Sequence, residues 1–185
     1  MAFTATFWFN CNKTGKSWLF TSHLSHKTKK SLQTTSPYAL LHVSILSTGK
    51  TKELWLRMAM EEYLLRLRPF ITVDLLWTRD TQHLLQLVFK QPGCLYCLDS
   101  SGTLINSIEF KKLLYQSFEK GKVNFVIGGP EGLPEALKCK GKLLSLSPLT
   151  FTHQMTRLIL VEQIYRAAQI HKGTAYHKRE NGQEL

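Results

Sequence analysis

The chain has little cysteine, and it has no hydrophobic run long enough for a membrane-spanning helix or for the apolar core of a secretory signal. Its cysteines, Cys11, Cys94, Cys97 and Cys139, do not make the disulfide framework of a small secreted protein. We therefore expect no disulfide framework and no membrane association. With 185 residues, 43% of them hydrophobic, the chain is long enough for one α/β domain.

Acidic residues and arginine are absent from the first 40 positions, which contain five lysines and twelve serines or threonines. This composition is typical of a transit peptide, and the lack of arginine favours a chloroplast (plastid stroma) address over the mitochondrial matrix. The alternative is a disordered or mis-started extension on a bacterial cytoplasmic protein. In each case we place the folded domain at residues 41–185.

The positive charge extends into that domain. Of the formal net charge of +11, residues 1–40 contribute +5, which leaves +6 for residues 41–185. A basic domain suits a polyanionic partner such as RNA. Many solvated surfaces are mildly basic, so charge alone does not identify the partner.

Several catalytic motifs are missing. Gly49-Lys50-Thr51 resembles the end of a phosphate-binding P-loop, but Ser44 stands where the motif requires glycine. Gly15-Lys16-Ser17 fails in the same way, at Asn10. No G-x-G-x-x-G follows the first predicted strand, and no G-x-S-x-G occurs. P-loop nucleotide hydrolysis and serine hydrolysis both lose support.

Cys94 and Cys97 form a C-x-x-C motif, which elsewhere can bind metal or carry out redox chemistry. Here the motif lies in the apolar run CLYCLD, which predicts a buried strand. Strand residues three apart point to opposite faces of a sheet. We therefore expect no metal site.

Apolar and amphipathic segments alternate from residue 41 onward, in the order βαβαβαβαβα. Strands are expected at 41–46, 70–77, 95–99, 123–127 and 143–146, and helices at 52–67, 81–90, 106–119, 130–137 and 154–171. This order predicts a mainly parallel sheet with helices on both faces. Ligands of such folds bind beyond the carboxyl ends of the strands, which here lead into loops at 99–103, 128–132 and 147–153.

Two of these loops are candidate ligand-binding loops. In Gly128-Gly129-Pro130-Glu131-Gly132, the glycines let the backbone approach a ligand, and Pro130 suits the first position of a helix whose free amides favour an anionic or polar group. Ser147-Pro148-Leu149-Thr150-Phe151-Thr152, together with Leu98, offers a pocket for an adenine ring. The simpler alternatives are an ordinary glycine-rich turn and a packed connection before a helix capped by Thr152.

The last predicted helix and the tail after it hold a third group of polar residues. Glu162 and Arg166 have the i, i+4 spacing of a surface ion pair. Arg166 also lies between a predicted apolar stripe and a short tail with Tyr176 and His177, which is the kind of segment that ordinarily forms a frayed end. The stripe consists of Leu158, Val161, Tyr165 and Ala168.

Residues from about 41 to 180 resemble the RlmH (YbeA-like) group of SPOUT methyltransferases. The resemblance is carried by IGGPEGL at 127–133, LSLSPLTFTH at 144–153, VEQIYRA at 161–167 and AYHKRE at 175–180, in this order and at these spacings. It implies a SPOUT α/β fold with a mainly parallel sheet and a C-terminal trefoil knot. It also implies a homodimer, S-adenosyl-L-methionine as the methyl donor, and methylation of N3 of a pseudouridine in the intersubunit stem-loop of large-subunit (23S-type) ribosomal RNA.

The resemblance also assigns site residues. The cofactor-binding positions are Leu98, Gly128, Gly129, Ser147, Pro148, Leu149, Thr150, Phe151 and Thr152. The candidate catalytic positions are Arg166, Tyr176 and His177. The imide nitrogen of the base is weakly acidic, so methylation needs its proton removed or its anion stabilised. We hypothesise that His177 assists removal of this proton and that Arg166 stabilises the negative charge or anchors a phosphate. Tyr176 would stack on or hydrogen-bond the base.

The chain departs from the family pattern in three places: Lys178 stands where the family often has arginine, residues 181–185 extend the tail, and the segment between the second strand and second helix is short. Two alternative functions stay open. One is a catalytically silent SPOUT RNA-binding or ribosome-assembly factor, and the other is a SPOUT enzyme that acts on transfer RNA.

Overall fold

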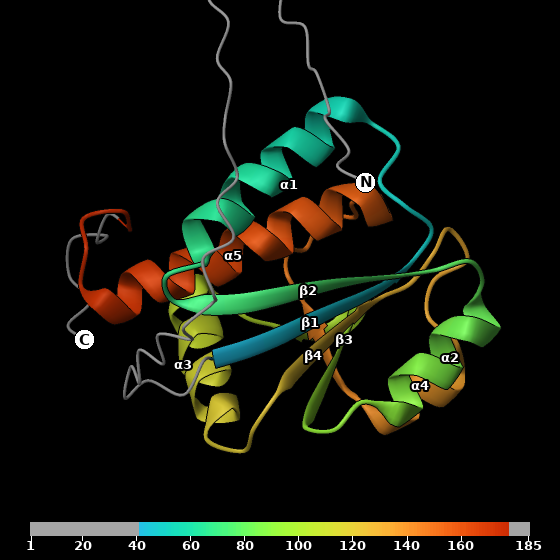
Figure 1. Ribbon diagram of the computed structural model, residues 1–185. Helices are drawn as coiled ribbons and strands as arrows, with labels where there is room; N and C mark the ends of the chain where they lie inside the picture. The colour runs from blue at the N-terminus through green and yellow to red at the C-terminus, as the bar shows by residue number, and fades with distance from the viewer. Residues whose placement is uncertain (1–40, 178–185) are drawn as a thin grey trace, which may run out of the picture. The chain divides into compact units, whose positions relative to one another are not determined.

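The structure is a computed structural model, shown in Figure 1, and it describes residues 41–177. The predicted alternation of strands and helices is confirmed. The predictions for residues 1–40, Lys178 and residues 181–185 lie outside the described residues. The elements are β1 (Leu41–Thr48), α1 (Leu54–Leu67), β2 (Ile71–Thr78), α2 (Thr81–Lys90), β3 (Cys94–Leu104), α3 (Ser107–Phe118), β4 (Val123–Ile127), α4 (Glu135–Lys140), β5 (Lys142–Ser145) and α5 (His153–Lys172).

The five strands form one sheet in the order β2-β1-β4-β3-β5, and every pair in it is parallel. All five strands therefore end at the same edge, where the loops to α1, α2, α4 and α5 begin. Helices α1, α3 and α5 cover one face of the sheet, and α2 and α4 cover the other (Figure 1). This architecture is consistent with the trefoil knot that the resemblance implies, and the threading of the knot stays a prediction.

A separate apolar core lies on each face of the sheet. The larger core joins the sheet to α1, α3 and α5, and the smaller one joins it to α2 and α4. Cys94 packs against the larger core, whereas Cys97 belongs to the smaller one. The two cysteines thus lie on opposite faces, as the strand periodicity predicted. None of the helices within residues 41–177 is long and apolar enough to cross a membrane.

The prediction that the fourth helix begins at Pro130 is wrong. Gly132 N donates to the Gly129 carbonyl (3.0 Å), so residues 129–132 form a tight turn, and α4 begins only at Glu135. A second proline explains the delay, because a residue that precedes proline disfavours helical backbone and Leu133 precedes Pro134. The predicted anion-binding amides of a helix that starts at Pro130 are therefore not formed.

The third strand also differs from its prediction. It was expected to end at Asp99, but β3 continues to Leu104 after an irregular stretch in which its register with β5 shifts. Gly102 allows this continuation, since a Cβ at that position would lie 2.5 Å from the Leu144 amide nitrogen. The predicted loop at 99–103 is thus part of the sheet edge and passes close to β5.

Candidate functional site

A cavity of about 200 Å³ lies beyond the carboxyl ends of β3, β4 and β5. This is the end of the sheet at which a ligand was expected. Seven of the nine predicted cofactor-binding residues line the cavity, and Pro148 and Thr152 do not. The seven are Leu98, Gly128, Gly129, Ser147, Leu149, Thr150 and Phe151.

The glycine-rich loop forms one side of the cavity with little more than backbone. A Cβ at Gly128 would overlap the backbone of Gly132, so the turn requires glycine there. A Cβ at Gly129 would meet only the Thr48 side chain, at an ordinary distance of 3.5 Å. The loop therefore brings main-chain groups to the cavity without side chains in between.

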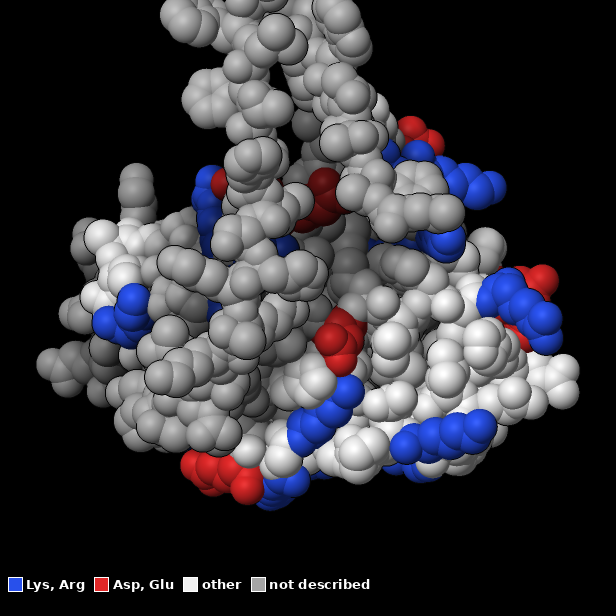
Figure 2. Space-filling model, in the orientation of Figure 1, with Lys and Arg blue, Asp and Glu red and all other residues white. Residues whose placement is uncertain are grey.

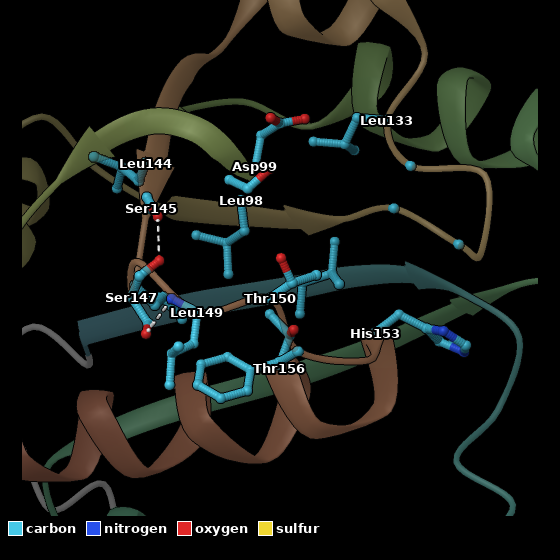
Figure 3. A pocket seen from close by; sticks show the side chains of 17 residues that line it. Leu98, Asp99, Leu133, Leu144, Ser145, Ser147, Leu149, Thr150, His153 and Thr156 are labelled. Atoms are coloured by element: carbon cyan, nitrogen blue, oxygen red, sulfur yellow. Dashed lines mark hydrogen bonds between the residues drawn. The ribbon is translucent and has the colours of Figure 1, made fainter.

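The loop between β5 and α5 forms the opposite side and is fixed by its own serines. Ser145 Oγ donates to the Ser147 carbonyl (2.9 Å), and Leu149 N donates to Ser147 Oγ (2.9 Å), as drawn in Figure 3. This conformation leaves Leu149 71% exposed and Phe151 37% exposed at the rim of the cavity. An apolar, open rim of this kind suits a flat ring system or a second protein surface.

Thr152 has a structural role in this loop. It is the N-cap of α5, and its hydroxyl accepts a hydrogen bond from Met155 N (3.3 Å). The predicted cap is therefore confirmed. Its effect on a ligand is indirect, because it fixes the start of the helix whose first turn borders the cavity.

The cavity also contains an ionised carboxylate that the motifs did not single out. Asp99 accepts hydrogen bonds from Ser101 Oγ (2.6 Å) and Ser101 N (2.9 Å) and pairs with Lys138 Nζ (3.0 Å). The bonds from Ser101, aided by Lys138, lower the pKa of Asp99 to about 2. A signal was present in the sequence, since Asp99 is the last residue of the predicted third strand.

His153 and Thr156, on the first turn of α5, complete the cavity. In Figure 3 the His153 ring lies at the edge of the site, apart from the other labelled side chains. Burial and the nearby Arg157 lower the pKa of His153. The imidazole is therefore neutral at neutral pH and can accept a hydrogen bond.

The three predicted catalytic residues form a second group, at the other end of α5. Gly173 ends the helix with φ +72°, and Thr174 N donates back to the Gln169 carbonyl (3.1 Å), so the chain reverses direction. This reversal brings His177 next to Arg166, with 3.4 Å between His177 Nδ1 and Arg166 Nη1. The Arg166 guanidinium also lies 5.0 Å from the centre of the Tyr176 ring.

Glu162 organises this tail group, which consists of Arg166, Tyr176 and His177. Its Oε1 atom accepts hydrogen bonds from Arg166 Nη2 (2.6 Å) and from the Tyr176 hydroxyl (3.1 Å). The predicted i, i+4 pair is thus present, and it is largely shielded, with the two side chains 17% and 27% exposed. Burial raises the pKa of Tyr176, and Glu162 adds to the shift, so the phenol stays protonated.

The electrostatics of Arg166 follow from the same contacts. Partial burial acts to lower its pKa, but the bond with Glu162 outweighs burial and the pKa is raised. The guanidinium is therefore a permanent cation, and Glu162 is paired with it through Nη2. Its remaining N–H groups can donate to an anion or a carbonyl oxygen.

The cavity and the tail group are well separated within one subunit. Thr156 borders the cavity, and Arg166 lies ten residues further along α5. At 1.5 Å per helical residue, the two positions are about 15 Å apart along the helix axis. One subunit alone therefore does not bring the predicted catalytic residues to its own cavity.

Comparison with known proteins identifies the family of the chain. A family model described as "Predicted SPOUT methyltransferase" matches residues 41–177. The chain is 48% identical over 141 residues to the ribosomal RNA large subunit methyltransferase H of Protochlamydia amoebophila, covering 75% of this chain and 100% of that protein. It is 39% identical over 137 residues to the protein of the same name in Prochlorococcus marinus, covering 74% of this chain and 95% of that protein. The chain therefore belongs to the SPOUT methyltransferase family and, within it, to the RlmH group that its motifs resemble.

Proposed function

We propose that this protein is an S-adenosyl-L-methionine-dependent methyltransferase that methylates N3 of a pseudouridine in the intersubunit stem-loop of large-subunit ribosomal RNA. The observation that carries the proposal is that the two motif loops, which α4 and β5 separate in the chain, close on one cavity at the carboxyl edge of the sheet. Relatives that are 48% and 39% identical to the chain are named as large-subunit ribosomal RNA methyltransferases, and the chain covers them almost completely.

The residues around the cavity fit the proposed cofactor. Leu98, Leu149 and Phe151 offer apolar surface for an adenine ring, and the bare backbone at Gly128 and Gly129 can approach polar groups closely. Asp99 is an ionised acceptor suited to ribose hydroxyls or an ammonium group. When bound, S-adenosyl-L-methionine supplies an electrophilic methyl group on a sulfonium.

The tail group supplies the chemistry that the acceptor base requires. The N3 imide of pseudouridine is a weak acid, so transfer needs its proton removed or its anion stabilised. Arg166 can donate to an imide oxygen or hold a backbone phosphate. Tyr176, protonated and directed by Glu162, can stack on the base or hydrogen-bond it.

The contact between Arg166 and His177 refines the hypothesis that His177 assists proton removal. A guanidinium only donates hydrogen bonds, so His177 Nδ1 must accept in this contact, and neutral His177 then carries its proton on Nε2. In this arrangement Nε2, the ring nitrogen that does not face Arg166, donates a hydrogen bond and cannot accept one. To take the imide proton, His177 must give up the contact with Arg166. It can then accept the proton at the freed Nδ1, or at Nε2 if the tautomer changes so that Nδ1 carries the ring proton and Nε2 is free.

A homodimer would resolve the separation between cavity and tail group. In a two-fold symmetric dimer whose α5 helices run antiparallel, the tail group of one subunit approaches the cavity of the other, and two equivalent sites form. Apolar side chains suited to burial are exposed on α1, beside α5, and at the cavity rim. They include Leu54 (58% exposed), Trp55 (58%), Met58 (60%) and Leu149 (71%).

Mixed dimers test this arrangement directly. A subunit with a blocked cavity (Gly128→Ala) and a subunit without the tail group (Arg166→Ala, His177→Ala) should each be inactive alone. After co-expression, heterodimers purified with two different tags should recover about half of the wild-type activity per dimer, because one of the two composite sites is intact. Heterodimers as inactive as both parents would contradict a site shared between subunits.

The RNA partner is supported by charge as well as by family. Residues 41–185 carry a net charge of +6, and Lys and Arg side chains are spread around the visible face of the described region (Figure 2). Basic surface of this kind strengthens binding to phosphate backbones in a salt-dependent way. The intersubunit stem-loop is the specific target that we propose within large-subunit RNA.

The decisive experiment is mass spectrometry of ribosomal RNA from cells that lack the protein. The expected result is unmodified pseudouridine in the intersubunit stem-loop, in place of 3-methylpseudouridine, with restoration by the intact gene. Loss of a methyl group from transfer RNA instead would favour the alternative tRNA enzyme. Calorimetry completes the test, because a catalytically silent RNA-binding factor need not bind S-adenosyl-L-methionine.

For residues 1–40 we propose a plastid-targeting role, based on their lysines, serines and threonines and on their lack of arginine and acidic residues. The family match begins at residue 41, after this segment. Residues 1–40 fused to a fluorescent protein should enter plastids, whereas the fluorescent protein alone should stay in the cytosol. Import into mitochondria, or no import, would contradict the plastid address.

A further inference from the structure

Arg157 is an unusual residue of α5, because its whole side chain is buried. Its exposure is 0%, and it is the largest of the fully buried side chains in residues 41–177. Within residues 41–177, no carboxylate forms an ion pair with it. Burial lowers its pKa to about 10, so Arg157 is still a cation at neutral pH.

The hydrogen bonds of this buried cation all go to one place, the carboxyl end of β1 and the residues just after it. Arg157 Nε and Nη2 donate to Ser47 Oγ (3.1 and 3.0 Å). Nη2 also donates to the Thr48 carbonyl, and Nη1 donates to Thr51 Oγ1 (3.2 Å). The guanidinium lies 4.6 Å from the Trp77 ring on β2, the register partner of Ser47.

Core packing alone does not account for this arrangement. A desolvated charge is costly, and apolar residues of similar volume often replace buried ionic groups without loss of stability. A planar group with several fixed donors, in contrast, orients the partners it binds. Arg157 thus fixes where the end of β1 lies relative to the first two turns of α5.

The α5 segment borders the cofactor cavity, and the end of β1 lies behind the glycine-rich loop that forms one of its walls. On the α5 side, His153 and Thr156 line it directly. On the β1 side, the Thr48 side chain lies against Gly129, 3.5 Å from the position of an added Cβ. Thr48 Oγ1 is buried and has no hydrogen-bond partner among the residues that the structure describes, so its place is set by this packing and by the bond from Arg157 to its carbonyl.

We infer that Arg157 is a positioning residue of the cofactor site, which holds the Gly129 loop at the correct distance from the α5 side of the cavity through Ser47 and Thr48. Arg157 does not touch the cofactor. The inference rests on the proposed function only in taking S-adenosyl-L-methionine as the ligand of this cavity.

The test compares cofactor affinity in Arg157→Lys and Arg157→Met by calorimetry, with the full chain and without RNA. Lysine keeps the positive charge but lacks the planar set of hydrogen-bond donors of the guanidinium. Methionine lacks both the charge and the donors. The dissociation constant for S-adenosyl-L-methionine should rise about tenfold in the lysine variant, equivalent to one lost hydrogen bond to a charged group, and further in the methionine variant. With ribosomes as substrate, KM for the cofactor should rise while kcat at saturating cofactor stays within about threefold of wild type.

A matched control separates positioning from general loss of stability. Leu114→Ala, in the larger core on α3 and away from the cavity, also removes a fully buried side chain. It should lower the melting temperature and leave cofactor affinity unchanged. If Arg157→Lys binds the cofactor as wild type does, the inference is wrong, whatever its effect on melting temperature.

A second variant covers the case in which both Arg157 variants fail to fold. Thr48→Ala removes the side chain that packs on Gly129 and keeps the carbonyl to which Arg157 donates. It should fold normally and weaken cofactor binding about threefold to tenfold. Wild-type affinity in Thr48→Ala would overturn the inference, whereas absence of cofactor binding in the wild-type protein would instead overturn the proposed function.

Discussion

At the scale of single residues, two adjacent glycines make different demands on the loop after β4. Gly128 has no room for a Cβ, because the backbone of Gly132 and Leu133 occupies that space. Gly129 has room, with Thr48 at ordinary contact distance. An alanine at Gly128 should distort the turn, whereas an alanine at Gly129 should only add a methyl group beside the cavity. Comparing the two variants therefore separates these two effects.

We expect Gly128→Ala to open the turn and to cost about 1–3 kcal/mol of unfolding free energy, as overpacked sites do. Cofactor binding should fall below detection in calorimetry, since the backbone at the cavity moves. Gly129→Ala should keep the wild-type melting temperature and show a smaller loss of affinity. Equal effects at the two positions would show that the tight turn does not shape the cavity.

Asp99 makes a second prediction at this scale, which concerns pH. Its folded-state pKa of about 2 lies below the ordinary 3.8, so ionised Asp99 stabilises the fold. That contribution is fully present well above pH 3.8 and is lost as the pH falls through 3.8 toward about 2. Asp99→Asn should therefore be less stable than wild type at pH 7, by about 1 kcal/mol once solvent screening is allowed for.

Urea denaturation of both proteins from pH 7 down to pH 2 measures this difference. The gap between the two unfolding free energies should stay constant to about pH 5, and it should narrow progressively below that value as the carboxylate of the wild-type protein is protonated. A gap that does not depend on pH would mean that the charge of Asp99 contributes nothing to stability.

At the scale of elements, α5 is the part that connects the two halves of the site. Its first turn borders the cavity, Glu162 lies at its middle, and Arg166 lies one turn further along. Glu162 accepts from both Arg166 and Tyr176 through a single oxygen. It is therefore a positioning residue for the tail group, although it has no place in the proposed chemistry.

Glu162→Gln should lower the single-turnover methylation rate about tenfold to a hundredfold, because misplaced reacting groups are costly. Cofactor affinity should not change, since Glu162 does not line the cavity. Glu62→Gln on α1 is the matched control, because Glu62 and Arg66 form an i, i+4 pair of the same kind with side chains 53% and 49% exposed. Exposed pairs contribute little, so a comparable loss of rate in Glu62→Gln would contradict the assigned role.

The elements themselves could largely be predicted from the sequence. Helix α2 and strand β4 lie at their predicted residues, and the other boundaries mostly shift by one to three positions. On α3 the sequence predicts that Ile108, Leu113, Leu114 and Phe118 face inward, which is only partly correct. Leu114 is buried, whereas Ile108 is only half-buried, and Phe110, which the prediction omitted, is also buried. Periodicity predicts that a helix has an apolar side, but it fixes the direction of that side less well in a short helix.

What the sequence could not predict depends on distant partners. The sequence predicts nothing for Arg157, because its hydrogen-bond partners Ser47 and Thr51 lie more than a hundred positions away. The end of β3 depends on how closely Gly102 approaches β5. For Asp99, the sequence does show its position at the end of a predicted strand. It does not show that Ser101 and Lys138 bind its carboxylate.

At the scale of the whole molecule, the distance between cavity and tail group makes the oligomeric state part of the catalytic argument. Helix α1 lies in the same layer as α5 and exposes Trp55, Met58 and Leu65, at 58%, 60% and 55%. Exposed apolar side chains of this size suit an interface with a second copy. If the interface is disrupted, the cavity should still bind the cofactor, and only methyl transfer should be lost.

Met58→Glu tests this separation of binding and transfer. At the proposed two-fold interface, a buried, unpaired carboxylate would occur twice per dimer. The variant should therefore be monomeric in light scattering at concentrations at which we expect the wild type to be dimeric. Its affinity for S-adenosyl-L-methionine should stay within about threefold of wild type, because Met58 lies outside the cavity. Methylation of ribosomes should fall by at least about a hundredfold, as expected when reacting groups are no longer held together. A monomeric variant that retains full activity would show that each subunit carries a complete site, and the proposed sharing of the tail group between subunits would be wrong.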